Sequence, residues 1–237
     1  AGEHHVDPAR RRVLHELLRG RKYGFPMERV IFTAVLQRLF NPGSDRRGEK
    51  WMRRYAIDGA KGVGLHHFYR AMAWLGEVSI SAREHWDHTP RRIKDDIEEQ
   101  LFSLRRTLFS DLSMVFVDTT SIYFEGEGGT WLGRFGNSKD HRPDLKQFVL
   151  AIVLDNEGNP ICSEMMPGNV TDVTTLVPIA KRLKSRFGIE QICIVADRGM
   201  ISQETIGELE RLQWNYILGA RMRRTKDVRD DVLLRGG

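Results

Sequence analysis

The chain has 237 residues, of which 41% are hydrophobic and 29% are charged, and its net charge is +5. These values are typical of a globular protein with one or two hydrophobic cores. They argue against a membrane protein, since no apolar run reaches the length of a bilayer span, and against a disulfide framework, since both cysteines lie inside apolar runs. We therefore expect a soluble, cytoplasmic protein.

The positive charge is concentrated in the first half of the chain. Residues 1–112 contain 21 lysines and arginines against 15 aspartates and glutamates, whereas residues 113–237 contain 16 against 17. A charge of this size is common in proteins that bind no nucleic acid. A basic half joined to a nearly neutral half nevertheless favours an enzyme that holds a polyanion with one part and acts on it with the other.

The first half has the apolar periodicity of helices. Pro8 and Gly20 bound the first helix, and Ser44 is placed to cap the third. The predicted helices cover residues 8–19, residues 27–40, a stretch after Ser44, residues 65–75 and residues 90–109. We expect residues 1–112 to form an all-helical, basic domain.

From residue 113 the pattern changes to short strands alternating with helices. Strands are predicted over 114–118, 147–154 and 159–166, the last two joined in a hairpin, and then a helix over 174–187, a strand ending at Asp197, a helix over 202–213 and a strand over 216–220. The order β-β-β-α-β-α-β is that of the ribonuclease H-like fold, whose first and fourth strands are neighbours. We expect residues 113–237 to form an α/β core of this type, incomplete at its C-terminal end.

Two aspartates each follow a short apolar run, Asp118 after residues 114–117 and Asp197 after residues 192–196. Each run predicts a buried strand, so both carboxylates are expected at C-terminal strand ends, where open α/β sheets bind ligands. Mg²⁺ is typically held by one or two carboxylates, water and phosphate oxygens. The pair predicts a divalent-metal site for phosphoryl chemistry. The alternative is that each aspartate only caps the turn or helix that follows it.

Four blocks of sequence resemble the DDE transposases of bacterial insertion sequences, in the branch whose third acid lies in a Tyr-Arg-Glu-Lys signature. The blocks are VDTTS at 117–121, GNSKDHRPDLKQ at 136–147, PGNVTD at 167–172 and VADRGM at 195–200. The likeness covers most of the chain, and the second block is the most specific. By this resemblance, Asp118 and Asp197 are the first two acids of the catalytic triad and the ligands of Mg²⁺, with Mn²⁺ as a substitute.

The resemblance also implies partners and a cellular place. Such enzymes cut and rejoin double-stranded DNA at transposon terminal repeats and at a target, acting as homodimers on paired ends. A carboxylate triad holding two metal ions needs no covalent protein–DNA intermediate, and the sequence has no evident nucleophile motif. We therefore expect a nucleoid-associated DNA-binding protein with residues 1–112 as its DNA-binding domain.

Basic residues beside the expected metal site are candidates for DNA phosphate contacts. They are Lys139, His141, Arg142 and Lys146, in the loop before a strand, and Arg198, directly after the second acid. Arg142 is the best candidate because its planar guanidinium matches phosphate oxygens. The alternative is that these side chains are simply solvated. Asp172 is expected to cap the helix that follows it rather than to bind metal.

The third acid of the resembling family has no match in this chain. After Asp197 the acids on the predicted helix are Glu204, Glu208 and Glu210, and none stands in the expected signature. We expect a truncated transposase that is inactive on its own.

Two further functions stay open. One is a non-catalytic fragment that binds DNA or inhibits a complete transposase. The other is a haloacid dehalogenase-like phosphotransferase, which would need an acid two residues after its nucleophilic aspartate, where this chain has Thr120.

Overall fold

The computed structural model describes residues 8–79, 90–106, 114–137, 141–189, 193–200 and 202–219. The chain divides into two compact units, Ala1–Arg105 and Arg106–Gly237. Within the described ranges, no helix has the length and apolar character needed to cross a bilayer.

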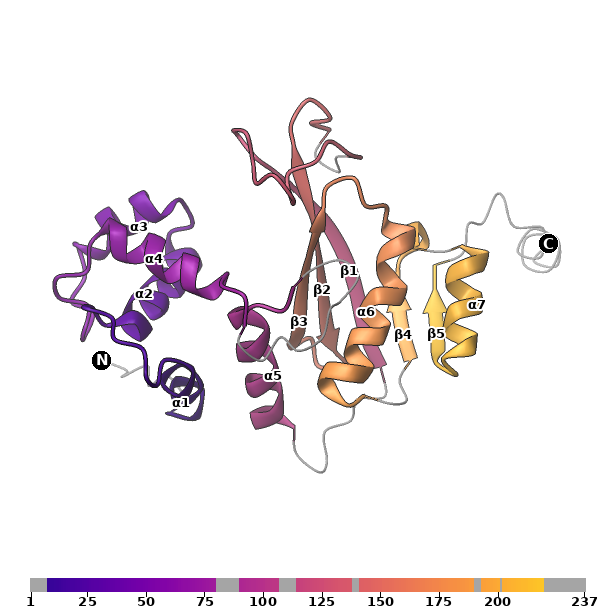
Figure 1. The fold of residues 1–237 in the computed structure, drawn as a ribbon, viewed down its shortest axis with the longest axis horizontal. Coiled ribbons are helices and arrows are strands. Elements are labelled where there is room, and N and C mark those ends of the chain that lie inside the picture. Colours follow the sequence, from indigo (N-terminus) through magenta and orange to yellow (C-terminus); the bar gives the residue numbers. More distant parts are fainter. Residues whose placement is uncertain are drawn as a thin grey trace, which may run out of the picture. The chain divides into compact units, whose positions relative to one another are not determined.

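The first unit consists of helices (Figure 1). They are α1 (Pro8–Leu17), α2 (Met27–Phe40), α3 (Asp45–Met52), α4 (Leu65–Leu75) and α5 (Ile93–Arg105). Ser44 caps α3 as predicted, since its side chain accepts a hydrogen bond from the Arg47 N–H. The predicted start of α5 at Pro90 was wrong, because Arg92 forms an isolated β-bridge with Val78 and the helix begins after it.

A hydrophobic core joins α2, α3 and α4. It includes Val30, Trp51, Phe68, Ala71 and Trp74, with Phe68 and Ala71 fully buried. The amphipathic helix α3 buries Trp51 and Met52 and turns its cationic side chains to solvent. This arrangement supplies the exposed positive charge that the sequence indicated for this half.

His67 ties down the first turn of α4. The Gly64 N–H donates a hydrogen bond to Nδ1 of His67, at 3.0 Å, which satisfies a backbone donor that the helix itself leaves open. This contact requires an unprotonated Nδ1. Burial lowers the pKa of His67, and the neighbouring charges of His66 and Arg70 lower it further. The fold therefore favours the neutral imidazole.

We expect the stability of the first unit to fall in mild acid because of His67. A histidine whose pKa is lowered by folding contributes fully above the unfolded-state pKa of about 6.5, and the contribution is lost as the pH falls towards the lower folded-state pKa. The free energy of unfolding, measured in urea at about pH 7.5 and about pH 5.5, should drop more in the wild type than in His67→Gln. His66→Gln is the control and should keep most of the drop. Equal losses in the wild type and His67→Gln would contradict the prediction.

The second unit is built on a five-stranded mixed sheet with the order β3-β2-β1-β4-β5. Its strands are β1 (Met114–Tyr123), β2 (Gln147–Asp155), β3 (Pro160–Pro167), β4 (Cys193–Ala196) and β5 (Asn215–Leu218). β1, β2 and β3 pair antiparallel, whereas β1–β4 and β4–β5 are parallel. The predicted hairpin between β2 and β3 is confirmed, and Asp155 closes it by accepting the N–H of Asn159 at 2.7 Å.

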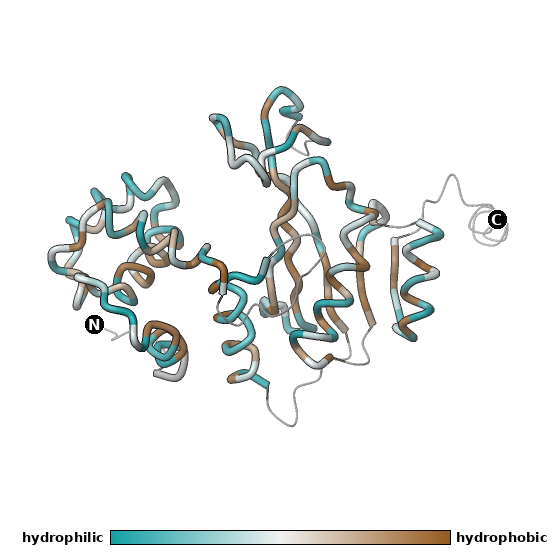
Figure 2. The backbone as a smooth tube through the Cα atoms, in the orientation of Figure 1, coloured by the Kyte–Doolittle hydropathy of each residue, from teal (hydrophilic) through white to brown (hydrophobic). Residues whose placement is uncertain are grey.

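Helix α6 (Asp172–Phe187) crosses one face of this sheet, and α7 (Gln203–Arg211) lies beside β5 (Figure 1). Leu176, Ile179 and Leu183 of α6 are buried. Much of the length of the strands is apolar (Figure 2). The opposite face is the more exposed one, with Phe116 40% and Ile152 38% accessible. The sheet therefore has a covered face and an open face.

Candidate active site

Asp118 lies in the middle of β1, on the open face of the sheet. Side chains along β1 alternate, with Val115, Val117, Thr119 and Ser121 buried. The sequence predicted that this strand ends at Asp118, which was wrong, because the strand continues to Tyr123 and still pairs there with Gln147 of β2. The β1–β2 ladder therefore holds the backbone on both sides of Asp118.

Asp197 directly follows β4 and is brought beside Asp118 by the strand register. The parallel ladder pairs Val117 of β1 with Ala196 of β4, and the residues that follow these two are Asp118 and Asp197. Neighbouring strands lie about 4.8 Å apart. Both aspartates line one open groove of about 620 Å³. The fold thus brings together the two acids that the sequence singled out.

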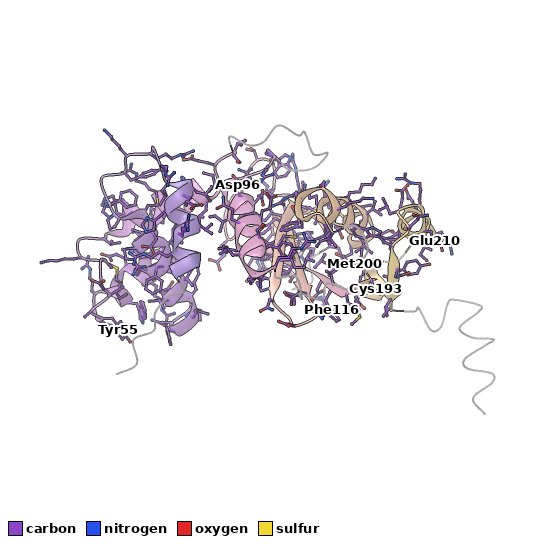
Figure 3. All side chains as sticks on the ribbon, turned by 90° about the horizontal axis from the view of Figure 1, so that it is seen from below. Tyr55, Asp96, Phe116, Cys193, Met200 and Glu210 are labelled. Atoms are coloured by element: carbon purple, nitrogen blue, oxygen red, sulfur yellow. The ribbon has the colours of Figure 1, made fainter. Side chains whose placement is uncertain are left out.

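The rest of the groove is mainly apolar. Its other lining residues are Phe116, Val117, Thr119, Thr120, Leu150, Ile152, Leu154, Val195 and Ala196. Figure 3 shows Phe116 and Cys193 on the side of the sheet away from α6, in keeping with the alternation along β1 and the pairing of Cys193 with Met114. The two carboxylates therefore lie in a mainly apolar groove.

The donor set suits a hard divalent cation. Asp118 and Asp197 are the acidic residues among the described lining of the groove. Mg²⁺ is typically held by one or two carboxylates, with waters and phosphate oxygens completing its octahedron. The part of the chain that the structure describes contains no cluster of three or more His, Cys, Asp or Glu side chains in a metal-binding arrangement. The pair therefore fits a Mg²⁺ or Mn²⁺ ion that takes its remaining ligands from water and substrate.

Two of the predicted DNA-contacting residues have side chains outside the described part of the structure. Lys139 lies outside the described residues. Arg198 begins the short helix η1 (Arg198–Met200) directly after Asp197, and its side chain is likewise outside the described part. Only its position next to the second acid bears on the site.

The other three predicted contacts lie outside the described lining of the groove. His141 is exposed and has a positive φ of 57°. Arg142 donates two hydrogen bonds to Asp144, at 2.9 and 2.8 Å, and this pairing raises the pKa of Arg142 and lowers that of Asp144. Lys146 forms an ion pair with Glu127 at 3.2 Å. A phosphate would therefore compete with a carboxylate for Arg142 and Lys146.

Asp172 occupies a different place from the one predicted. It was expected to cap α6, but Thr171 is the cap residue and Asp172 is the first residue of the helix. Its Oδ1 accepts a hydrogen bond from the hydroxyl of Thr119, at 2.9 Å. This contact joins two of the four blocks noted in the sequence, and no local pattern indicates it.

A buried ionic group was missed altogether. Glu164 on β3 contacts Arg182 and Arg186 of α6, and all three side chains are at most 9% exposed. The four-residue spacing of the two arginines places them on one helix face. The sequence signals for the group were this spacing and the charge of Glu164 in the mainly apolar strand β3.

The family comparison covers most of the second unit. Residues 110–235, just over half of the chain, match the family described as the transposase DDE domain. No curated protein sequence matches the chain.

Solved structures of transposases are among those similar to this chain. One is a piggyBac transposase synaptic complex with hairpin DNA, at 16% identity and a TM-score of 0.50, with 96% of this chain and 49% of that one covered. Another is a pre-cleavage Mos1 transpososome, at 13% identity and a TM-score of 0.32, with 86% and 63% covered. At 16% identity the first likeness concerns the fold alone. The chain thus spans about half to two thirds of the length of these proteins.

Proposed function

The chain belongs to the transposase DDE domain family, and we propose that it is a DNA transposase whose catalytic groove is the one lined by Asp118 and Asp197. The observation that carries the proposal is the juxtaposition of these two carboxylates on adjacent parallel strands. We further propose that the second unit has the ribonuclease H-like fold and that the protein is of the bacterial insertion-sequence type, on the strength of its four sequence blocks.

The proposed chemistry is phosphoryl transfer assisted by divalent metal. Asp118 and Asp197 would hold Mg²⁺, or Mn²⁺ in its place. A bound ion would lower the pKa of the attacking water or DNA 3′-hydroxyl and neutralise the leaving oxygen. The Thr119 N–H donates to Oδ1 of Asp118, at 2.7 Å, and so orients that carboxylate. No side chain needs to form a covalent bond with DNA in this scheme.

The proposed substrate is double-stranded DNA, held mainly by the first unit. Exposed cationic side chains gather on and just after α3, where they are able to contact phosphates without reading sequence: Arg46, Arg47, Lys50, Arg53 and Arg54. Arg53 is paired with Glu49, which reduces its share of the positive field. Action as a homodimer on paired DNA ends is part of the same proposal.

We expect Mn²⁺ binding to depend on both acids. Electron paramagnetic resonance should show that Asp118→Asn or Asp197→Asn weakens Mn²⁺ binding at least about tenfold, because each removes one anionic ligand from an ion that gives up its waters reluctantly. The control is Asp144→Asn, an exposed aspartate outside the groove lining, which should bind like the wild type. Equal binding by Asp118→Asn and the wild type would exclude the metal site.

A nicking assay on supercoiled plasmid separates catalysis from binding alone. Metal-dependent nicking that either asparagine variant abolishes supports the enzyme. The second candidate, a protein that binds DNA without cutting it, is favoured by the two-acid lining of the described groove, which leaves a second ion short of an anionic ligand. DNA retention without nicking by the 237-residue chain would decide for that candidate.

A further inference from the structure

Thr119 connects the two faces of the sheet directly beneath the proposed metal site. Successive side chains of a strand point to opposite faces, so Thr119 points to the covered face while Asp118 points to the open one. Thr119 is only 5% exposed. Its hydroxyl donates to Oδ1 of Asp172 at 2.9 Å, and its backbone N–H donates to Oδ1 of Asp118 at 2.7 Å. One residue therefore contacts a carboxylate on each side of the sheet.

Asp172 also faces the turn that carries the second acid. A Cβ built on Gly199 would lie 3.4 Å from Oδ2 of Asp172, so the backbone of η1 passes close to that oxygen. The same turn is closed by the hydrogen bond from the Met200 N–H to the carbonyl oxygen of Asp197, at 3.0 Å. The two carboxylate oxygens of Asp172 thus lie beside Thr119, which follows Asp118, and Gly199, which lies two residues after Asp197.

The start of α6 is itself held in place. The Thr205 hydroxyl of α7 donates to the carbonyl oxygen of Val173, at 3.2 Å, and Thr205 is buried. A negative charge in the first turn of a helix is favoured by the helix dipole, which helps to hold the Asp172 carboxylate in place. Asp172 therefore has a fixed position relative to β1 and η1.

We propose that Asp172 and Thr119 are positioning residues for the acid pair, acting from the covered face of the sheet. Asp172 fixes the Thr119 side chain, and Thr119 in turn directs its N–H to Asp118. The close approach of Asp172 to Gly199 in η1 sets the distance between Asp118 and Asp197. The inference rests on the proposed function, since these residues would position the two acids of the proposed metal site. Outer contacts of this kind typically change metal affinity about 10–100-fold.

Four variants of the full chain test the link. Thr119→Val and Asp172→Ala remove the donor and the acceptor, whereas Thr119→Ser and Asp172→Asn keep them. We expect the first two to weaken Mn²⁺ binding about tenfold or more, and the second two to stay within about threefold of the wild type. The double variant Thr119→Val/Asp172→Ala should lose no more than the worse single variant, because both break one link.

A second measurement makes the test independent of the metal. Hydrogen exchange of the residue-119 amide, followed by NMR without metal, should be about tenfold faster in Thr119→Val and Asp172→Ala and unchanged in Thr119→Ser and Asp172→Asn. Thermal unfolding of each variant identifies any general loss of structure. If the wild type fails to bind Mn²⁺ but exchange follows this pattern, the proposed function fails and the positioning link stands. If neither exchange nor Mn²⁺ affinity separates the two pairs of variants, the positioning role is overturned.

Discussion

We expect Glu164→Gln to lower the free energy of unfolding of the second unit by about 3–5 kcal/mol, the usual cost of breaking a buried ion pair from one side. Glu164 lies on β3, and its carboxylate contacts Arg182 and sits 3.2 Å from Arg186. The two guanidinium groups are almost completely buried. Without the carboxylate, two positive charges would remain in the interior close to each other.

Urea denaturation followed by circular dichroism measures this loss. The matched control is Glu157→Gln in the exposed hairpin turn, which should change stability by no more than about 0.5 kcal/mol. A loss below about 1 kcal/mol in Glu164→Gln would mean that other groups compensate for the two arginines.

The second large effect is expected at Gly168, at the end of β3. The Gly168 N–H donates to the carbonyl oxygen of Leu132, at 3.1 Å, and the carbonyl oxygen of Gly168 accepts a hydrogen bond from the Gln147 side chain, at 3.3 Å. A Cβ here would overlap the carbonyl oxygen of Gln147 and lie 2.5 Å from that of Arg134. Both obstacles are backbone atoms, which cannot rotate away. Gly168→Ala should therefore cost about 3 kcal/mol, at the upper end of the range for overpacking.

Gly126→Ala is the control for Gly168→Ala. A Cβ at Gly126 meets nothing within 4 Å, and its backbone φ is not in the left-handed region. This change should be neutral or slightly stabilising, since alanine reduces the freedom of the unfolded chain. Thermal melting of the two variants separates the steric effect from the entropic one. Similar melting temperatures for both would contradict the close backbone crossing at Gly168.

The sequence indicated the acid pair because apolar runs and strand order are local signals. The run before Asp197 is short and apolar, and it forms β4 as expected. The continuation of β1 beyond Asp118 was not indicated by an apolar run. Beyond Asp118 the covered face continues with Thr119 and Ser121, whose buried hydroxyls look like surface residues in the sequence. Hydroxyl groups are tolerated there when they find a hydrogen-bond partner, as Thr119 does in Asp172.

Contacts between residues far apart in the sequence were not predicted, because no local pattern indicates them. Glu164 and its arginines lie on different elements, and only the folded sheet brings them together. Arg142 shows the opposite case, where a local partner was overlooked. Its guanidinium matches phosphate geometry, but Asp144 stands only two residues away and accepts two hydrogen bonds from it. The side-chain type was a guide to what Arg142 is able to bind, not to what it contacts in this structure.

The parallel pairing of β1 with β4 also determines when the groove can form during folding. β2 and β3 are joined by a tight hairpin and can pair early, whereas β4 begins at Cys193, far along the chain from Met114. Contacts between such distant segments form slowly, because a long loop must close before they stabilise the structure. On a ribosome, β1 with Asp118 would emerge well before Asp197. The two acids therefore meet only once β4 has joined the sheet, so a nascent chain that still lacks β4 cannot form the groove.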